Sequence, residues 1–165
     1  MNQTLHHNDV SLKLHLADEV ATHAFAAKLA AVLQPGLKIY LSGELGSGKT
    51  SLVRGVLRAL GFSDKVKSPT FTLAEVYDIS DLTLYHFDFY RLENAEEWLD
   101  AGFDEYFDSD VICFVEWPER AAKLPPADLW LKLDVLSTGR NLSVKAQTAT
   151  GETCLTTLQK SLRKN

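Results

Sequence analysis

The spacing of apolar side chains changes along the chain between a helical period and a strand period, which predicts an α/β protein. A helix is expected over residues 18–33, because Asp18 is a potential N-cap, apolar residues follow one helical face, and Pro35-Gly36 ends the pattern. Residues 37–42 predict a short strand. Residues 50–60, which stop at a glycine, predict a second helix.

Two β-rich runs follow, at residues 71–79 and 83–90. Only Ser80-Asp81-Leu82 separates them, which is too short for a crossover helix, so we expect an antiparallel hairpin. Residues 111–115 are continuously apolar and stop at Glu116. Such a run predicts a strand that is covered on both faces.

The rest of the chain supplies weaker signals. A helix is expected over residues 94–107, and strands over residues 129–135 and 142–147 with a turn at 138–141 between them. Residues 154–162 fit either a strand or a short helix.

Composition indicates an ordinary globular protein. The chain is 45% hydrophobic, and no repeat or linker divides it, so residues 1–165 are expected to form a single domain. With 22 acidic and 17 basic side chains, the net charge of -5 argues against an extended nucleic-acid surface. We therefore expect no DNA partner and only an indirect role for tRNA. No secretory pattern or bilayer-length apolar run is visible, so we expect a cytoplasmic protein with no membrane partner.

A glycine-rich motif lies between the first expected strand and the second expected helix. GELGSGKT, residues 43–50, fits the P-loop pattern G-x-x-x-x-G-K-[ST] in the context that this motif requires. Glycines let successive N–H groups turn inward around a phosphate, and the helix N-terminus adds partial positive charge. The expected nucleotide-binding residues of the loop, with the one that follows it, are Gly43, Glu44, Leu45, Gly46, Ser47, Gly48, Lys49, Thr50 and Ser51.

Other side chains suggest how a nucleotide would be held. Lys49 is expected to bridge the β- and γ-phosphates, and Thr50 to give one oxygen to Mg²⁺. The metal or its water also needs an acid at the end of a neighbouring strand. Asp88 in YHFDFY and Glu116 in VICFVEW both qualify, and Glu116 follows the more continuous apolar run.

Several positions keep two interpretations. Thr70 in SPTF is either a switch hydroxyl that senses the γ-phosphate or part of a turn before a strand. Trp117 either caps the core or faces a partner. Arg91 and Arg140 could approach phosphates, although surface salt bridges are the commoner fate of such residues. For His86, a structural hydrogen bond is expected rather than catalysis.

Four motifs, taken in their order and spacing, resemble the TsaE (YjeE) family, the small bacterial ATPases required for making threonylcarbamoyladenosine in tRNA. The motifs are GELGSGKT, SPTFTL at 68–73, YHFDFYRL at 85–92 and VEWPER at 115–120. The resemblance is strong over residues 37–120 and weaker outside this span.

The resemblance implies ATP and Mg²⁺ as cofactors, and roles for the residues that match. Lys49 and Thr50 would contact the phosphates and the metal, and Thr70 would be the switch hydroxyl. Asp88 and Glu116 would be the acids needed for ATP turnover, and the Trp117 ring would lie beside the site. The resemblance also implies that the protein hydrolyses ATP on a complex of TsaD and TsaB and resets that complex between turnovers.

Three other functions are compatible with a P-loop. A small-molecule kinase usually adds a lid with several arginines, and no arginine-dense segment is present. A regulatory GTPase needs N/T-K-x-D and D-x-x-G motifs, and neither occurs. A nucleotide-gated binding module with incidental hydrolysis is not separated from an ATPase by sequence. The expected fold is a three-layer α/β P-loop NTPase domain, whose mixed sheet combines a parallel core with an antiparallel hairpin.

Overall fold

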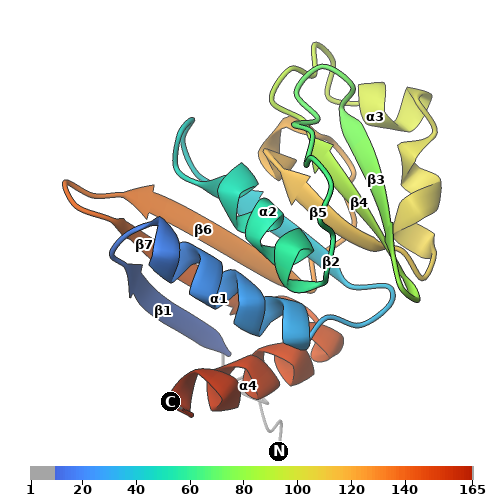
Figure 1. Ribbon diagram of the computed structural model, residues 1–165. Coiled ribbons are helices and arrows are strands. Elements are labelled where there is room, and N and C mark those ends of the chain that lie inside the picture. Colours follow the sequence, from blue (N-terminus) through green and yellow to red (C-terminus); the bar gives the residue numbers. More distant parts are fainter. Residues whose placement is uncertain (1–9, 165) are drawn as a thin grey trace, which may run out of the picture.

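A seven-stranded mixed sheet forms the centre of the protein, shown in Figure 1 as a computed structural model whose described residues are 10–164. The strand order is β1-β7-β6-β2-β5-β4-β3. The elements in chain order are β1 (Ser11–Leu16), α1 (Glu19–Ala31), β2 (Lys38–Ser42), α2 (Lys49–Ala59), β3 (Ala74–Ile79), β4 (Leu82–Asp88), α3 (Glu97–Asp100), η1 (Phe103–Asp108, a 3₁₀ helix), β5 (Ile112–Glu116), η2 (Pro118–Arg120, a 3₁₀ helix), β6 (Leu129–Val135), β7 (Arg140–Ala146) and α4 (Ala149–Arg163).

The centre of the sheet is parallel and both of its flanks are antiparallel. β2 pairs in parallel with β5 and β6, and β4 pairs in parallel with β5. The β3–β4 hairpin on one flank confirms the expected antiparallel addition. On the other flank, the strands expected over residues 129–135 and 142–147 are present as the antiparallel pair β6 and β7, whereas β1, which pairs with β7, was not predicted. The strict alternation of polar and apolar residues over 11–16 is the strand signal that indicates β1.

Helices cover the sheet on both faces and make three layers. α1, α2 and α4 bury their apolar sides against one face, in a core to which β2 contributes Ile39 and Leu41. α3 and η1 cover part of the other face, where Trp98 and Phe107 pack with Tyr40 of β2. Successive strand side chains point to opposite faces, which is why Tyr40 belongs to the second core. Figure 1 shows α1 and α2 side by side over the sheet.

The prediction of one helix over residues 94–107 is wrong, because two short helices, α3 and η1, lie there. Gly102 takes a left-handed conformation, with φ of +79°, so the chain leaves α3 after one turn and continues as η1. The strand expected from residue 71 begins at Ala74, because residues 69–73 form turns in which the Leu73 N–H bonds the Pro69 carbonyl.

Two further boundaries follow from cross-strand pairing and capping. Arg140 was expected in a turn, but it pairs with Val135 and with Leu16, so β7 begins there and the turn lies at 136–139. Residues 154–162, which fit either a strand or a short helix, belong to helix α4. α4 begins after Thr148, whose hydroxyl accepts the Gly151 N–H as an N-cap.

No helix within residues 10–164 combines the length and the apolar character needed to cross a membrane.

Candidate functional site

The carboxyl ends of three parallel strands bring the predicted site residues to one edge of the sheet. Asp88 ends β4 and Glu116 ends β5, and the two residues lie opposite each other in the strand pairing. Leu41 of β2 pairs with Glu116 on the other side, and the chain then leaves β2 into the glycine loop. The acids and the loop therefore meet where neighbouring parallel strands end, which is where ligands bind in open α/β sheets.

Side-chain direction places both acids on the side of the sheet that α2 covers. Leu84 on β4 and Phe114 on β5 belong to the core beneath α1 and α2. Because strand side chains alternate, His86, Asp88 and Glu116 point to this same side. The acids therefore face the N-terminus of α2 rather than the aromatic core on the other face.

Glycine is required at defined places in the loop of residues 43–50. Gly46 and Gly48 have φ of +78° and +106°, a left-handed region that L side chains rarely adopt. Gly43, with φ of +149°, is also crowded: a Cβ there would lie 2.6 Å from the Ser47 Oγ and 2.7 Å from the Leu133 carbonyl oxygen. The loop thus closes tightly on itself before α2 begins.

Lys49 is buried within its own loop. Its side chain is 4% exposed, and its ammonium donates to the carbonyl oxygens of Gly43 at 2.5 Å and Glu44 at 3.0 Å. The ammonium also lies 4.6 Å from the centroid of the Trp117 ring. Burial lowers the pKa of Lys49, while the nearby carboxylates of Glu116 and Asp88 act in the opposite direction. A cation held in this way favours an incoming anion.

Glu116 joins the first turn of α2 to the strands. Its carboxylate is 3% exposed and accepts the Thr50 hydroxyl, with Oγ1 at 3.0 Å from Oε1 and 2.9 Å from Oε2. His86 Nε2 lies 2.6 Å from Oε2. The hydrogen bond expected for His86 is therefore present. Its partner is Glu116, which follows the more continuous apolar run of the two candidate acids.

Asp88 lies next to this pair. It is 7% exposed and accepts the Tyr90 N–H at 3.0 Å. Burial raises the pKa of Asp88, and the neighbouring Glu116 raises it further, against the opposite effects of the Tyr90 hydrogen bond, His86 and Lys49. Two adjacent buried carboxylates create a local excess of negative charge.

The donor set fits a hard divalent cation. The Thr50 hydroxyl and the carboxylates of Asp88 and Glu116 offer oxygen ligands only, and a dication would offset the charge of the adjacent carboxylates. Within residues 10–164, no cluster of three or more His, Cys, Asp or Glu side chains forms a complete metal cage. Mg²⁺ characteristically takes only one or two protein carboxylates, together with waters and substrate phosphates.

We call the space bounded by these groups the acid-lined hollow. Its volume is about 290 Å³, and Leu45, Gly46, Ser47, Gly48, Lys49, Thr50, Ser51, Thr70, Asp88, Glu116 and Trp117 line it. The structure thus brings together every predicted site residue except Gly43 and Glu44, whose carbonyls hold Lys49 below the loop.

Thr70 and Trp117 reach the acid-lined hollow from irregular segments. The Thr70 hydroxyl lies 2.6 Å from the Ser68 Oγ, within the turns that precede β3. Trp117 follows β5 with φ of +57°, a left-handed conformation for a bulky residue, and its ring lies 4.9 Å from that of Tyr90. The ring borders the hollow against Lys49, the position that the family resemblance implies, and it also packs against the aromatic core.

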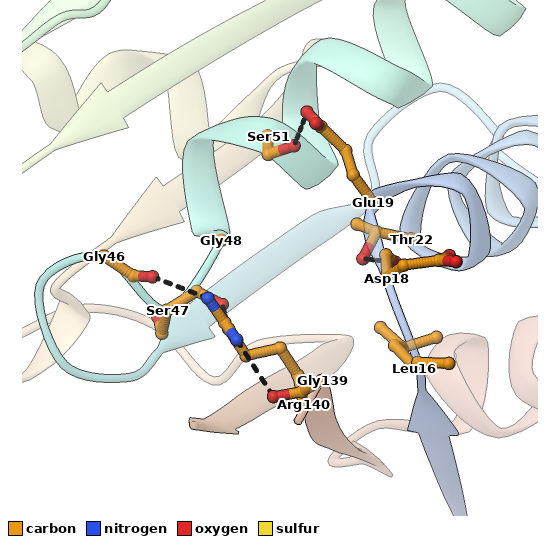
Figure 2. A pocket seen from close by; sticks show the side chains of 11 residues that line it. Leu16, Asp18, Glu19, Thr22, Gly46, Ser47, Gly48, Ser51, Gly139 and Arg140 are labelled. Carbon is orange, nitrogen blue, oxygen red and sulfur yellow. Dashed lines mark hydrogen bonds between the residues drawn. The ribbon is translucent and has the colours of Figure 1, made fainter. Parts of the chain in front are cut away.

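A second cavity, of about 330 Å³, lies on the other side of the loop and is shown in Figure 2. We call it the arginine-side cavity. Gly46, Ser47, Gly48 and Ser51 line it as they line the first, and its other walls are Leu16, Ala17, Asp18, Glu19, Thr22, Gly139 and Arg140. Ser51 donates to Glu19 at 3.2 Å, which connects the starts of α2 and α1. The two cavities are neighbours that share loop residues.

Arg140 supports the loop from this second side, and the surface salt bridge expected for it is wrong. Its Nε donates to the Ser47 carbonyl at 3.0 Å, its Nη2 to the Gly46 carbonyl at 3.3 Å and its Nη1 to the Gly139 carbonyl at 2.9 Å (Figure 2). A guanidinium has five donors in a fixed fork, which suits several carbonyls at once. Spacing in the sequence carries no signal for this contact, because 93 positions separate Arg140 from Ser47.

Comparison with known proteins identifies the family. The family model "Threonylcarbamoyl adenosine biosynthesis protein TsaE" matches residues 16–147. The chain belongs to the TsaE family. Similar members are the TsaE of Haemophilus influenzae, 40% identical over 148 residues that cover 86% of this chain and 94% of the relative, and the TsaE of Bacillus subtilis, 42% identical over 64% of this chain and 66% of the relative. Both are named tRNA threonylcarbamoyladenosine biosynthesis proteins.

Solved structures agree with this assignment. The crystal structure of Bacillus subtilis YdiB superimposes with a TM-score of 0.81 and 30% sequence identity, covering 95% of this chain and 99% of that one. The resemblance drawn from four sequence motifs is thereby confirmed, as is the expected α/β P-loop NTPase fold of the TsaE family.

Proposed function

We propose that this protein is the ATP-binding and ATP-hydrolysing component of the cytoplasmic machinery that makes threonylcarbamoyladenosine in tRNA, and that it acts on a complex of TsaB and TsaD. The observation that carries the proposal is the convergence of Lys49 and Thr50 with Asp88 and Glu116 at one hollow. Membership of the TsaE family supports the pathway. tRNA is involved only through the partner complex.

The triphosphate would lie over the loop, where N–H groups and the α2 N-terminus face it. Lys49 would leave the carbonyls of Gly43 and Glu44 and bridge the β- and γ-phosphates, beside the face of Trp117. Thr70 would contact the γ-phosphate end, because its hydroxyl borders the same hollow.

Thr50, Glu116 and Asp88 would hold Mg²⁺ directly or through its waters. Bound Mg²⁺ would neutralise charge that develops on the phosphates. Glu116, already hydrogen-bonded to the Thr50 hydroxyl, would orient the attacking water or the metal's own water. Asp88 would do the same from the next strand.

The ribose and adenine would occupy the arginine-side cavity. A nucleotide can reach both spaces because Ser47, Gly48 and Ser51 line each of them. The cavity offers the acceptors Asp18 and Glu19, which suit an exocyclic amino group such as that of adenine (Figure 2). Leu16 and Ala17, from the chain before α1, line this cavity and would form a wall for the base.

Slow hydrolysis by the isolated protein is expected because no arginine among residues 10–164 lines the acid-lined hollow. Arg140 is committed to the loop carbonyls, and Arg91 and Arg120 lie over the rings of Phe71 and Tyr90. An arginine finger contributes about 10³–10⁵ in rate to phosphoryl transfer, so its absence leaves a large part of the acceleration to a partner.

The deciding experiment measures binding and hydrolysis of ATP and GTP, each with and without the TsaB–TsaD complex. We expect tight binding of ATP over GTP, slow turnover alone and faster turnover with the complex. Equal turnover with and without the complex would contradict a partner-gated mechanism, and failure to bind ATP would contradict the function itself.

A nucleotide-gated binding module is the second candidate, and one surface feature favours it. Leu45 and Phe71 are 64% and 82% exposed. Leu45 lines the acid-lined hollow, and Phe71 follows Thr70, another lining residue, in the chain. Exposed apolar side chains of this kind are common at protein interfaces. If a variant that binds ATP without hydrolysing it still supports repeated tRNA modification, the binding module is the better description.

A further inference from the structure

We propose that His86 is a positioning residue that fixes the Glu116 carboxylate for its work at the Thr50 hydroxyl. The inference rests on the proposed function and assigns to β4 a second contribution besides Asp88. Thr50, Glu116 and His86 form one continuous chain of hydrogen bonds, from the first turn of α2 through the end of β5 to β4.

His86 has no access to solvent. Its relative exposure is 0%, and it pairs with Phe114 of β5 and Glu75 of β3 in the sheet. It lies two residues before Asp88 and on the same side of β4, beneath α2. It therefore cannot contact phosphates, and any effect it has must pass through Glu116.

The two ring nitrogens have different surroundings. Nε2 lies 2.6 Å from Glu116 Oε2, whereas Nδ1 is buried and has no hydrogen-bond partner among the described residues. An ionised carboxylate only accepts hydrogen bonds, so the proton must be on Nε2. Buried polar atoms are almost always paired, so an unpaired Nδ1 carries a cost that the Glu116 contact must offset.

The contact orients the carboxylate. Both carboxylate oxygens lie within 3.0 Å of the Thr50 hydroxyl, which has only one proton to give, so Thr50 alone does not distinguish one oxygen from the other. His86 adds a second donor that contacts Oε2 only, and this breaks the symmetry between the two oxygens. Oε1, which His86 does not contact, is then the oxygen with acceptor capacity left for the site. Supporting groups behind catalytic carboxylates and metal ligands typically change affinity or activity by about 10–100-fold when removed.

The first test observes the ring in the native protein. Nitrogen chemical shifts of the histidine side chains, measured by NMR on the ¹⁵N-labelled protein without nucleotide, report which nitrogen carries the proton. The His86 signals are assigned by their loss in His86→Gln. We expect a proton on Nε2; a ring protonated on Nδ1 with a bare Nε2 overturns the proposal.

The second test removes and restores the donor. His86→Leu introduces an apolar side chain of similar size that cannot donate a hydrogen bond. In His86→Gln, the amide nitrogen can donate from about the same distance along the side chain as the histidine Nε2. We expect His86→Leu to lower kcat about 10–100-fold, with ATP affinity within about threefold of the parent, and His86→Gln to recover most of the loss. His15→Leu, on the exposed face of β1, is the matched control and should leave kcat unchanged.

The outcomes separate structural from positioning roles. Thermal unfolding is measured for every variant, and kcat for those that remain folded at the assay temperature. A parental kcat in His86→Leu, or an equal loss in His86→Gln and His86→Leu, overturns the proposal. If His86→Leu does not fold, the ring protonation and the kcat of His86→Gln decide. A parent that neither binds nor hydrolyses ATP defeats the proposed function instead, and the NMR result then stands alone as the test of the contact.

Discussion

The two sides of the glycine loop are built differently. On the side of β5 and β4, the loop faces buried ionisable groups at the ends of parallel strands, Asp88 and Glu116. On the side of β6 and β7, it faces an antiparallel flank from which Arg140 donates to two loop carbonyls. Charged groups on the first side are aligned for chemistry on a phosphate, whereas the second side fixes the shape of the loop and borders the cavity for the base. Changes on the two sides should therefore affect different measured quantities.

The largest effect is expected from Lys49→Ala, which removes the cation of the acid-lined hollow. We expect ATP affinity to fall at least about 100-fold, because hydrogen bonds to charged groups contribute about 1.5–3 kcal/mol each and Lys49 would contact two phosphates. Calorimetric titration with ATP measures this, and Lys145→Ala on the exposed face of β7 is the control. Unchanged affinity would place the triphosphate elsewhere.

Glu116→Gln should separate chemistry from binding. The amide can still accept from Thr50 but loses the negative charge, so we expect ATP affinity within about threefold of the parent and kcat lower by about 10²-fold or more. Phosphate release in the presence of the partner complex is the measurement, and Glu105→Gln, at an exposed position of η1, is the control. Hydrolysis at the parental rate would remove Glu116 from the mechanism.

Asp88→Asn should lower activity and raise stability. We expect slower hydrolysis, by about 10-fold or more, and a nucleotide-free protein about 1 kcal/mol more stable, because the variant keeps the acceptor for Tyr90 and loses a carboxylate whose burial is costly. The pKa of Asp88 is raised above the usual 3.8 in the folded state. The stability gain should therefore be complete above the folded pKa and disappear as pH falls below about 3.8.

Denaturant unfolding of parent and Asp88→Asn at several pH values measures this difference. A variant that is less stable than the parent at neutral pH would make Asp88 a structural residue instead of one held at some cost for the site.

The smallest effect is expected from Arg140→Lys, on the supporting side of the loop. Lysine keeps the charge but cannot bond three carbonyls from one plane. We expect ATP affinity to fall about three- to tenfold, as for loss of about 1 kcal/mol of hydrogen bonding, while kcat at saturating ATP stays within about twofold. Titration and saturation kinetics give both values. A fall in kcat as large as that of Glu116→Gln would abolish the distinction between the two sides.

The parts of the fold that could be predicted are those with local signals. Alternation of apolar residues and the short turn were enough to predict β4 and its hairpin, and the continuous apolar run was enough to predict β5. The helix across Gly102 was wrong because one glycine in a left-handed conformation outweighed the periodicity around it. β1 was missed although its alternation is regular, and its place at the sheet edge depends on pairing with β7, far along the chain.

The sequence by itself determined the loop and identified the residues expected to join it in the site. A phosphate-binding loop needs glycines, a lysine and a hydroxyl at fixed spacing, and these are local properties of the chain. The tertiary structure alone decided which groups support them. His86 meets Glu116 across 30 residues and Arg140 meets Ser47 across 93. Such contacts arise only when strands distant in sequence become neighbours in the sheet, and hydrogen bonds depend on distance and direction in space, which residue spacing does not encode.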